Sequence, residues 1–144
     1  MSEFGSKQTL LIQKNRRIEV AGTGRMILEL HHIQLAMPEG EEQAARNFYC
    51  GVLGLCEVDK PEELRSRGGA WFESGSVKVH LGVEKPFAPA KKAHPAFRVE
   101  KLDRAIASLQ SRGLEFRFDI DLPGIRRVYV SDPFGNRIEL LELV

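Results

Sequence analysis

Three histidines and one glutamate are the residues of this sequence best suited to bind a metal ion or to move a proton. His32, His80, His94 and Glu139 each lie in a stretch that alternates polar and apolar residues. Successive side chains of a β-strand point to opposite faces, so each of the four is expected opposite the apolar, core-facing residues. Imidazole nitrogens and carboxylate oxygens held on strands can serve as metal ligands or as acid–base groups.

The elements that position these residues repeat along the chain. Residue alternation predicts strands at 30–37, 55–59, 70–74 and 76–84, with a helix at 41–52. The second half predicts strands at 94–99, 115–118, 126–131 and 136–143, with a helix at 102–112. Matching glycines, Gly54 and Gly113, follow the two helices. We therefore expect an α+β fold of two tandem βαβββ modules, about 29–84 and 94–143, with a linker at 85–93.

The repeat also relates the four candidate residues to one another. His32 and His94 take matching places in the first strands of the two halves, while His80 and Glu139 take near-matching places in the last strands. Two modules related by a pseudo-two-fold axis would form a curved sheet around a groove that holds a metal through all four. For any one histidine alone, a surface or satisfied core position is the simpler interpretation. His31 is expected on the opposite face, in a structural role near the helix.

Further residues share the groove side of their strands by the same alternation and are expected to bind substrate: Gln34, Trp71, Arg127 and Tyr129. For Trp71 the alternative is an ordinary core tryptophan, and for Arg127 it is a solvated edge charge. A divalent cation, three neutral imidazoles and one carboxylate leave a charge of about +1, which favours an anionic or oxygen-rich ligand. Glu139 is the candidate catalytic base, and His80 takes that role if it does not bind the metal.

Composition excludes several other classes. The chain has 144 residues and a formal net charge of +1, which favours neither nucleic acid nor a membrane surface as partner. No apolar run reaches the roughly 18 residues of a transmembrane helix, and no signal peptide is visible. Two cysteines indicate thiols of a cytoplasmic protein.

Residues 1–28 are expected to form a basic N-terminal extension, in part a candidate cloning remnant, with short strands at 10–12 and 17–20. Residues 29–144 are expected to form a single domain.

The chain resembles the vicinal oxygen chelate superfamily, which includes glyoxalase I, fosfomycin-resistance proteins, extradiol dioxygenases and bleomycin-binding proteins. The resemblance covers about residues 29–143 and rests on HHIQL at 31–35, FYxxVLGL at 48–55, AHPAF at 93–97 and DPFGNRIE at 132–139. It implies paired βαβββ modules and a divalent metal, such as Zn, Ni, Mn, Co or Fe, in the groove. His32, His94 and Glu139 match the recurrent metal ligands, and His80 stands where glyoxalase I has a glutamate.

The same resemblance implies a metal-dependent lyase, isomerase or transferase acting on a small molecule that chelates the metal through vicinal oxygens. Because His80 replaces a carboxylate that glyoxalase I uses near its metal, glutathione-dependent glyoxalase activity is not expected. The alternatives are an extradiol-type dioxygenase, with His32, His94 and Glu139 on iron, and a non-enzymatic drug- or metabolite-binding protein of the bleomycin-resistance type. The resemblance also implies a homodimer, with the site either within one chain or between two.

Overall fold

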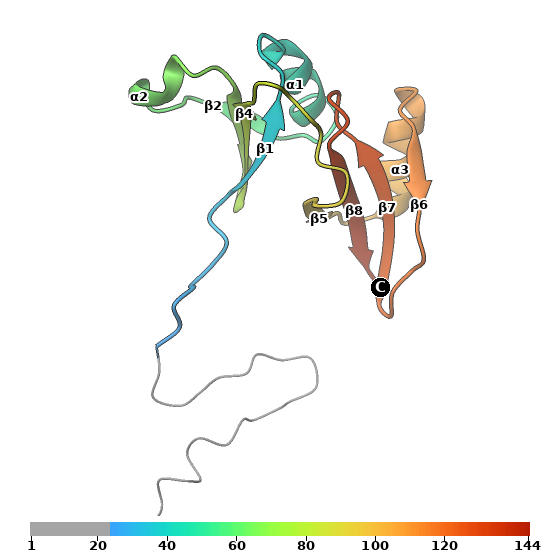
Figure 1. Cartoon of the computed structure of the whole chain (residues 1–144). Helices are drawn as coiled ribbons and strands as arrows, with labels where there is room; N and C mark the ends of the chain where they lie inside the picture. Colours follow the sequence, from blue (N-terminus) through green and yellow to red (C-terminus); the bar gives the residue numbers. More distant parts are fainter. Residues whose placement is uncertain (1–23) are drawn as a thin grey trace, which may run out of the picture. The chain divides into compact units, whose positions relative to one another are not determined.

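A computed structural model describes residues 24–144 of the chain, of which 31–144 form one compact unit (Figure 1). Residues 24–30 contain no helix or strand. The strands expected at 10–12 and 17–20 lie outside the described residues. None of the helices within 24–144 is long and apolar enough to cross a membrane.

The first module contains four strands and two helices. They follow one another as β1 (Ile33–Met37), α1 (Glu42–Tyr49), β2 (Cys56–Val58), α2 (Glu62–Arg65), β3 (Ala70–Ser74) and β4 (Val77–Val83). The strand order in the sheet is β1-β4-β3-β2, and only the β1–β4 pair is parallel. The short helix α2 lies between the strands predicted at 55–59 and 70–74, where no helix was predicted.

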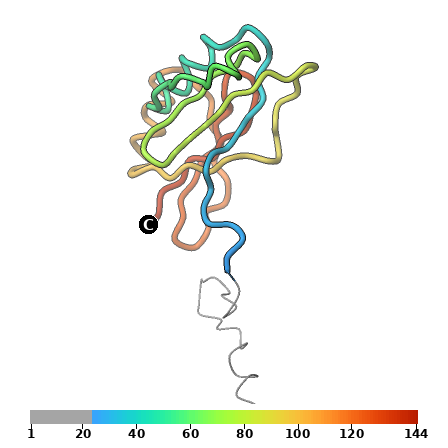
Figure 2. The backbone as a smooth tube through the Cα atoms, turned by 90° about the vertical axis from the view of Figure 1, so that its left-hand side faces the viewer, coloured from blue at the N-terminus to red at the C-terminus, as the bar shows by residue number. Residues whose placement is uncertain are grey.

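The second module repeats this arrangement without the extra helix. Its elements are β5 (Ala96–Arg98), α3 (Leu102–Ser111), β6 (Phe116–Phe118), β7 (Ile125–Ser131) and β8 (Arg137–Leu143). The strand order is β5-β8-β7-β6, and only the β5–β8 pair is parallel. The chain ends beside the β6–β7 connection, where the Val144 amide donates to the Gly124 carbonyl (Figure 2). The predicted α+β fold of two βαβββ modules is confirmed.

The apolar faces of the strands pack under the helices as the alternation predicts. Ile138 and Leu140 of β8 are buried, as are Val79 and Leu81 of β4. From the helices, the buried residues include Ala45, Phe48 and Tyr49 of α1 and Leu102 and Leu109 of α3. The first strand of each module begins later than predicted: β1 begins at Ile33 and β5 at Ala96, so His32 and His94 precede their strands. Pro95 has no backbone N–H to give to a ladder, which is consistent with the late start of β5.

The Asp-Pro-Phe-Gly-Asn turn is a buried polar joint between the modules. Asp132 accepts a hydrogen bond from the Tyr49 hydroxyl at 2.8 Å and another from the Asn136 side-chain amide at 2.8 Å. That same amide donates to the Ala36 carbonyl of β1 at 2.8 Å, and its oxygen accepts from the Ala90 amide at 2.9 Å. Burial, reinforced by the Asp132 carboxylate, raises the pKa of Tyr49, which keeps the phenol protonated as a donor.

A carboxylate from β8 caps the first turn of α3. The Leu102 amide donates to Glu142 Oε2 at 2.9 Å, and the Lys101 ammonium lies 3.4 Å from Oε1. The backbone hydrogen bond from Leu102, together with Lys101 and Arg126, lowers the pKa of Glu142. A helix N-terminus leaves amide donors without partners inside the helix, so this long-range contact satisfies one of them.

We expect Glu142→Gln to lower the thermal midpoint at neutral pH, because the neutral amide loses the charge-assisted bond to Leu102. A carboxylate whose pKa is lowered by folding stabilises the protein above the unfolded-state pKa of about 4.3, and this contribution is lost as pH falls through the folded value. The difference between variant and wild type should therefore shrink on acidification from pH about 6 to about 3. The exposed Glu29→Gln serves as control, and a difference that stays constant over this range would contradict the capping role.

Candidate metal site

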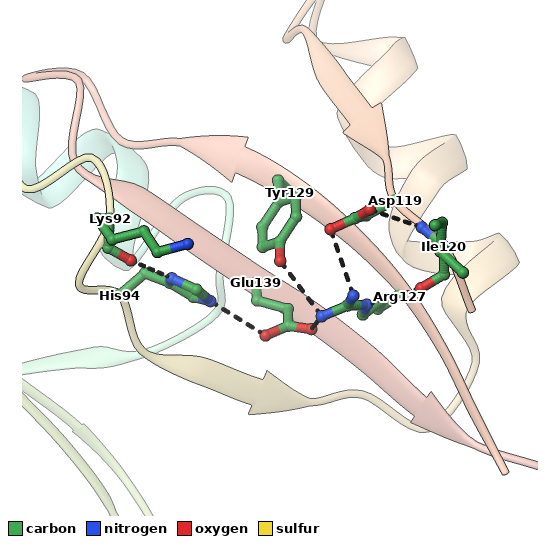
Figure 3. A network of polar contacts seen from close by, with 7 residues as sticks. All are labelled: Lys92, His94, Asp119, Ile120, Arg127, Tyr129 and Glu139. Atoms are coloured by element: carbon green, nitrogen blue, oxygen red, sulfur yellow. Dashed lines mark hydrogen bonds and ion pairs between the residues drawn. The ribbon is translucent and has the colours of Figure 1, made fainter. Parts of the chain in front are cut away.

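His94 and Glu139 form a close pair on the second module (Figure 3). Ala96 of β5 lies opposite Glu139 of β8, and the Glu139 amide donates to the Pro95 carbonyl, so the backbone brings the two side chains together. His94 Nε2 lies 3.2 Å from Glu139 Oε2. His94 Nδ1 lies 2.8 Å from the Lys92 carbonyl oxygen, which can only accept, so Nδ1 carries a proton. A histidine anchored in this way directs Nε2 toward a metal.

Arg127 holds the Glu139 carboxylate from the other side. Its Nη1 lies 3.2 Å from Glu139 Oε1 and donates to the Tyr129 hydroxyl at 3.3 Å, while Nε donates to the Ile120 carbonyl at 3.0 Å. The hydrogen bond to Glu139 raises the pKa of Arg127 further above its ordinary value. Arg127 also pairs with Asp119 at 3.3 Å, so the guanidinium is held at several points. Glu139 is 7% exposed, and both of its oxygens have partners.

The first module carries a stack of aromatic rings around His80. Trp71 of β3 lies directly opposite His80 of β4, and their rings are parallel with centroids 3.8 Å apart. The His32 ring, just before β1, also stacks on His80, with centroids 4.3 Å apart. Burial first, and His32 second, lower the pKa of His80, so its imidazole is neutral at neutral pH. Neutral imidazole is the form that binds metals.

The positions of Trp71 and His31 can also be compared with their predictions. Phe72 is fully buried in the core while its neighbour Trp71 faces His80. His31 does not lie against a helix as expected: it is exposed, and its Nδ1 lies 2.9 Å from His32 Nδ1. The reason is that β1 starts only at Ile33, so no strand alternation acts on the two histidines.

Gln34 is the predicted substrate-binding residue of β1. It lies opposite His80 in the parallel register, and its side chain extends over Gly82 of β4. A Cβ atom on Gly82 would be 2.5 Å from Gln34 Nε2, so only glycine leaves space for this position of the amide. No role was predicted for Gly82, although a glycine inside a strand signals a close approach of another group.

Tyr129 is surrounded by three guanidinium groups, of which only Arg127 was singled out from the sequence. The guanidinium carbons of Arg117, Arg127 and Arg137 lie 5.4, 5.8 and 5.0 Å from the centre of the Tyr129 ring. The register places Arg117 of β6 directly opposite Tyr129 of β7. The missing signal was the pairing between strands, because alternation within one strand does not show which residues of another strand lie beside it.

One chain thus presents two half-sites, defined as the pair His32 and His80 and the pair His94 and Glu139. Within residues 24–144 of a single chain, no three histidine, cysteine, aspartate or glutamate residues are close enough to hold a metal together. The two pairs lie on separate sheets that share no strand pairing. Each pair still offers donors that suit a borderline divalent metal, imidazole nitrogen alone or with a carboxylate oxygen. That all four form one site stays a prediction.

Comparison with known proteins agrees with this fold. A sequence model described as Glyoxalase/Bleomycin resistance protein/Dioxygenase superfamily matches residues 29–140. The chain is 28% identical over 133 residues to "Glyoxylase I 4" of Arabidopsis thaliana, a match that covers 85% of this chain and 75% of that protein.

Solved structures show the same fold. A putative glyoxalase family protein from Bacillus anthracis is 48% identical, with a TM-score of 0.81 over 85% of this chain and 100% of the other. A lactoylglutathione lyase from Agrobacterium tumefaciens is 21% identical, with a TM-score of 0.65 over 82% of this chain and 96% of the other, and that likeness concerns the fold alone. Because the family model matches residues 29–140 and the chain folds into two βαβββ modules, the chain belongs to the Glyoxalase/Bleomycin resistance protein/Dioxygenase superfamily.

Proposed function

We propose that this protein is a metal-dependent enzyme of the lyase, isomerase or transferase type, acting on a small oxygen-rich or anionic molecule that chelates the metal through two vicinal oxygens. The observation that carries the proposal is the His94–Glu139 pair, in which Nδ1 is anchored on a carbonyl and Nε2 faces a buried carboxylate. A surface histidine has no need of such an anchor, whereas a metal ligand gains a defined tautomer and orientation from it.

The metal-holding residues are His32, His80, His94 and Glu139, with Zn, Ni, Mn, Co or Fe as candidate ions. When bound, such an ion acts as a Lewis acid toward the two substrate oxygens. Glu139 is oriented by Arg127 and, if it leaves the metal, is the first candidate to accept a proton from substrate. His80, neutral and held against Trp71, takes this role if it does not bind the metal. The Gln34 amide, the Tyr129 hydroxyl and the Arg127 guanidinium supply donors that orient the ligand's oxygens.

The half-sites are proposed to meet in a homodimer. A two-fold axis that places the first module of one chain against the second module of its partner creates the reciprocal contact at the same time, and so completes two equivalent sites. Exposed apolar side chains near the second half-site support such a contact. Phe118 and Ile120 are 61% and 80% exposed, and the Ile120 carbonyl is the one that holds Arg127. Apolar patches of this kind often mark interfaces.

Mixing two inactive variants tests the proposal directly. His32→Ala and His94→Ala each damage a different half-site, so neither homodimer should bind a stoichiometric metal. In a dimer that contains one chain of each kind, one of the two sites is assembled from undamaged half-sites. With random exchange, half of the dimers are mixed, so metal binding should return to about a quarter of the wild-type amount. Elemental analysis after co-expression measures this recovery.

A mixture of His94→Ala with Glu139→Gln is the matched control, because both changes damage the same half-site and no recovery is expected. Recovery in neither mixture, with a metal bound to wild type, would place the complete site within one chain. A wild-type protein that binds no divalent metal would contradict the enzyme proposal and favour a binding protein. Bound iron together with oxygen uptake on catechols would favour the extradiol-type dioxygenase.

A further inference from the structure

A basic cavity lies on the second module beside the His94–Glu139 half-site. It has a volume of about 350 Å³, and its lining includes Lys91, Glu115, Arg117, Tyr129 and Arg137. Three of these side chains are cationic and one is anionic, so the lining carries a formal excess of two positive charges. Such an excess in a concave site attracts anions.

The three cations of this cavity have no carboxylate partner among residues 24–144. All eight ion pairs of the described residues involve other cations, and Lys91, Arg117 and Arg137 also form no side-chain hydrogen bond there. Arg127 differs, because it already forms ion pairs with Glu139 and Asp119. Positive charges that cluster without a partner repel one another, and an anion between them removes that repulsion.

The Tyr129 ring fixes the position of the two free guanidiniums. Arg117 and Arg137 lie 5.4 and 5.0 Å from its centre, within the range of cation–π attraction. Tyr129 itself is 9% exposed and lies between Arg117 and Glu139 in the strand register. Guanidiniums held in this way lose less rotamer freedom when they bind an oxyanion than free surface arginines do.

The cavity is adjacent to the proposed metal ligands. Arg137 and Glu139 lie on the same face of β8, two residues apart, which is a separation of about 6–7 Å along a strand. A ligand oxygen at Glu139 and an oxyanion at Arg137 can therefore belong to one small molecule.

We propose that the cavity formed by Lys91, Arg117, Arg137 and Tyr129 binds a dianionic oxyanion group, of the phosphate or phosphonate kind, carried by the substrate. This inference names a substrate class for the proposed enzyme and rests on that proposed function. The double negative charge matches the excess of two positive charges, and arginine forks donate in pairs to tetrahedral oxyanions. The dianionic group anchors the substrate, while its vicinal oxygens extend toward His94 and Glu139.

Binding of inorganic phosphate to chelator-treated protein tests the cavity separately from the metal. At about pH 8 phosphate is mainly a dianion, and its stabilisation of the fold reports its affinity through the rise of the thermal midpoint with concentration. At constant ionic strength, phosphate should stabilise wild type more than acetate does. Arg117→Ala and Arg137→Ala should each weaken phosphate binding by about tenfold, since each removes a charge-assisted contact. Arg104→Ala, an exposed arginine of α3 outside the cavity, should leave it unchanged.

The outcomes separate this inference from the enzyme proposal. If phosphate binds Arg117→Ala and Arg137→Ala as tightly as it binds wild type, the proposed oxyanion site is wrong, even if a stoichiometric metal is present. Equal stabilisation by acetate and phosphate would overturn the dianionic class. Phosphate binding that depends on both arginines would support the cavity even if wild type bound no metal, in which case only the enzyme proposal fails. Unchanged thermal midpoints of the variants without phosphate show that they fold.

Discussion

A His94→Ala variant is expected to lose stoichiometric binding of divalent metal, with an affinity at least about a hundredfold below that of wild type. The reason is that the change removes one donor and releases the Glu139 oxygen that it faces at 3.2 Å. Loss of a hydrogen bond that only orients a ligand already costs about 10–100-fold in metal affinity, so loss of a ligand should cost more. Elemental analysis and titration with zinc and nickel measure the effect.

Lys92→Ala is the matched control for this change. Lys92 contributes only its backbone carbonyl to His94, so removal of its side chain leaves the anchor in place. Its metal affinity should equal that of wild type. Folding of His94→Ala is checked by the thermal midpoint, which should change little because its side chain is 21% exposed and lies outside the core. Tight metal binding by a folded His94→Ala protein would refute this site.

Asn136→Ala is expected to destabilise the fold by about 3 kcal/mol or more, a large part of the stability of a domain of this size. Asn136 is fully buried and makes three side-chain hydrogen bonds, to Ala36, Ala90 and Asp132. Truncation leaves the buried carbonyl and amide without partners, and each such group costs about 1–3 kcal/mol. Urea unfolding of wild type and variant measures the difference.

Asn47→Ala provides the comparison for this experiment. Its amide oxygen accepts a bond from Gln43 on the exposed face of α1, so its loss should change the free energy of unfolding by less than about 0.5 kcal/mol. Tyr49→Phe should fall between the two, at about 1.5–3 kcal/mol, because it removes one donor to the charged Asp132. Equal stability of Asn136→Ala and Asn47→Ala would show that the joint between the modules does not stabilise the fold.

The C-terminal motif shows how much of the structure could be predicted from the sequence. The Asp-Pro-Phe-Gly-Asn pattern identified a turn, and alternation after it placed Ile138 and Leu140 in the core and Glu139 on the other face. The sequence contained no sign that Asp132 and Asn136 would be buried between the modules. Their partners Tyr49 and Ala36 lie 83 and 100 residues away, and such contacts arise only when the chain has folded.

The helix capped by Glu142 and the arginines around Tyr129 illustrate the same limit. Periodicity located α3, but its first turn is completed by a side chain from β8, 40 residues further along the chain. Alternation placed Tyr129 toward the groove, but the pairing of β6 with β7 brought Arg117 beside it. A period within one strand carries no information on the register between strands, which depends on packing and on the turns.

By itself, the sequence determined the two βαβββ modules, the faces of their strands and the residue types that could bind a metal, because short-range alternation and turn residues decide these features. The tertiary structure decided which of those residues meet. It paired His80 with His32 and Trp71, paired His94 with Glu139, and kept the pairs on separate sheets of one chain. The physical reason is that the positions of these side chains depend on the pairing of strands that are far apart in the sequence, which a local pattern does not contain.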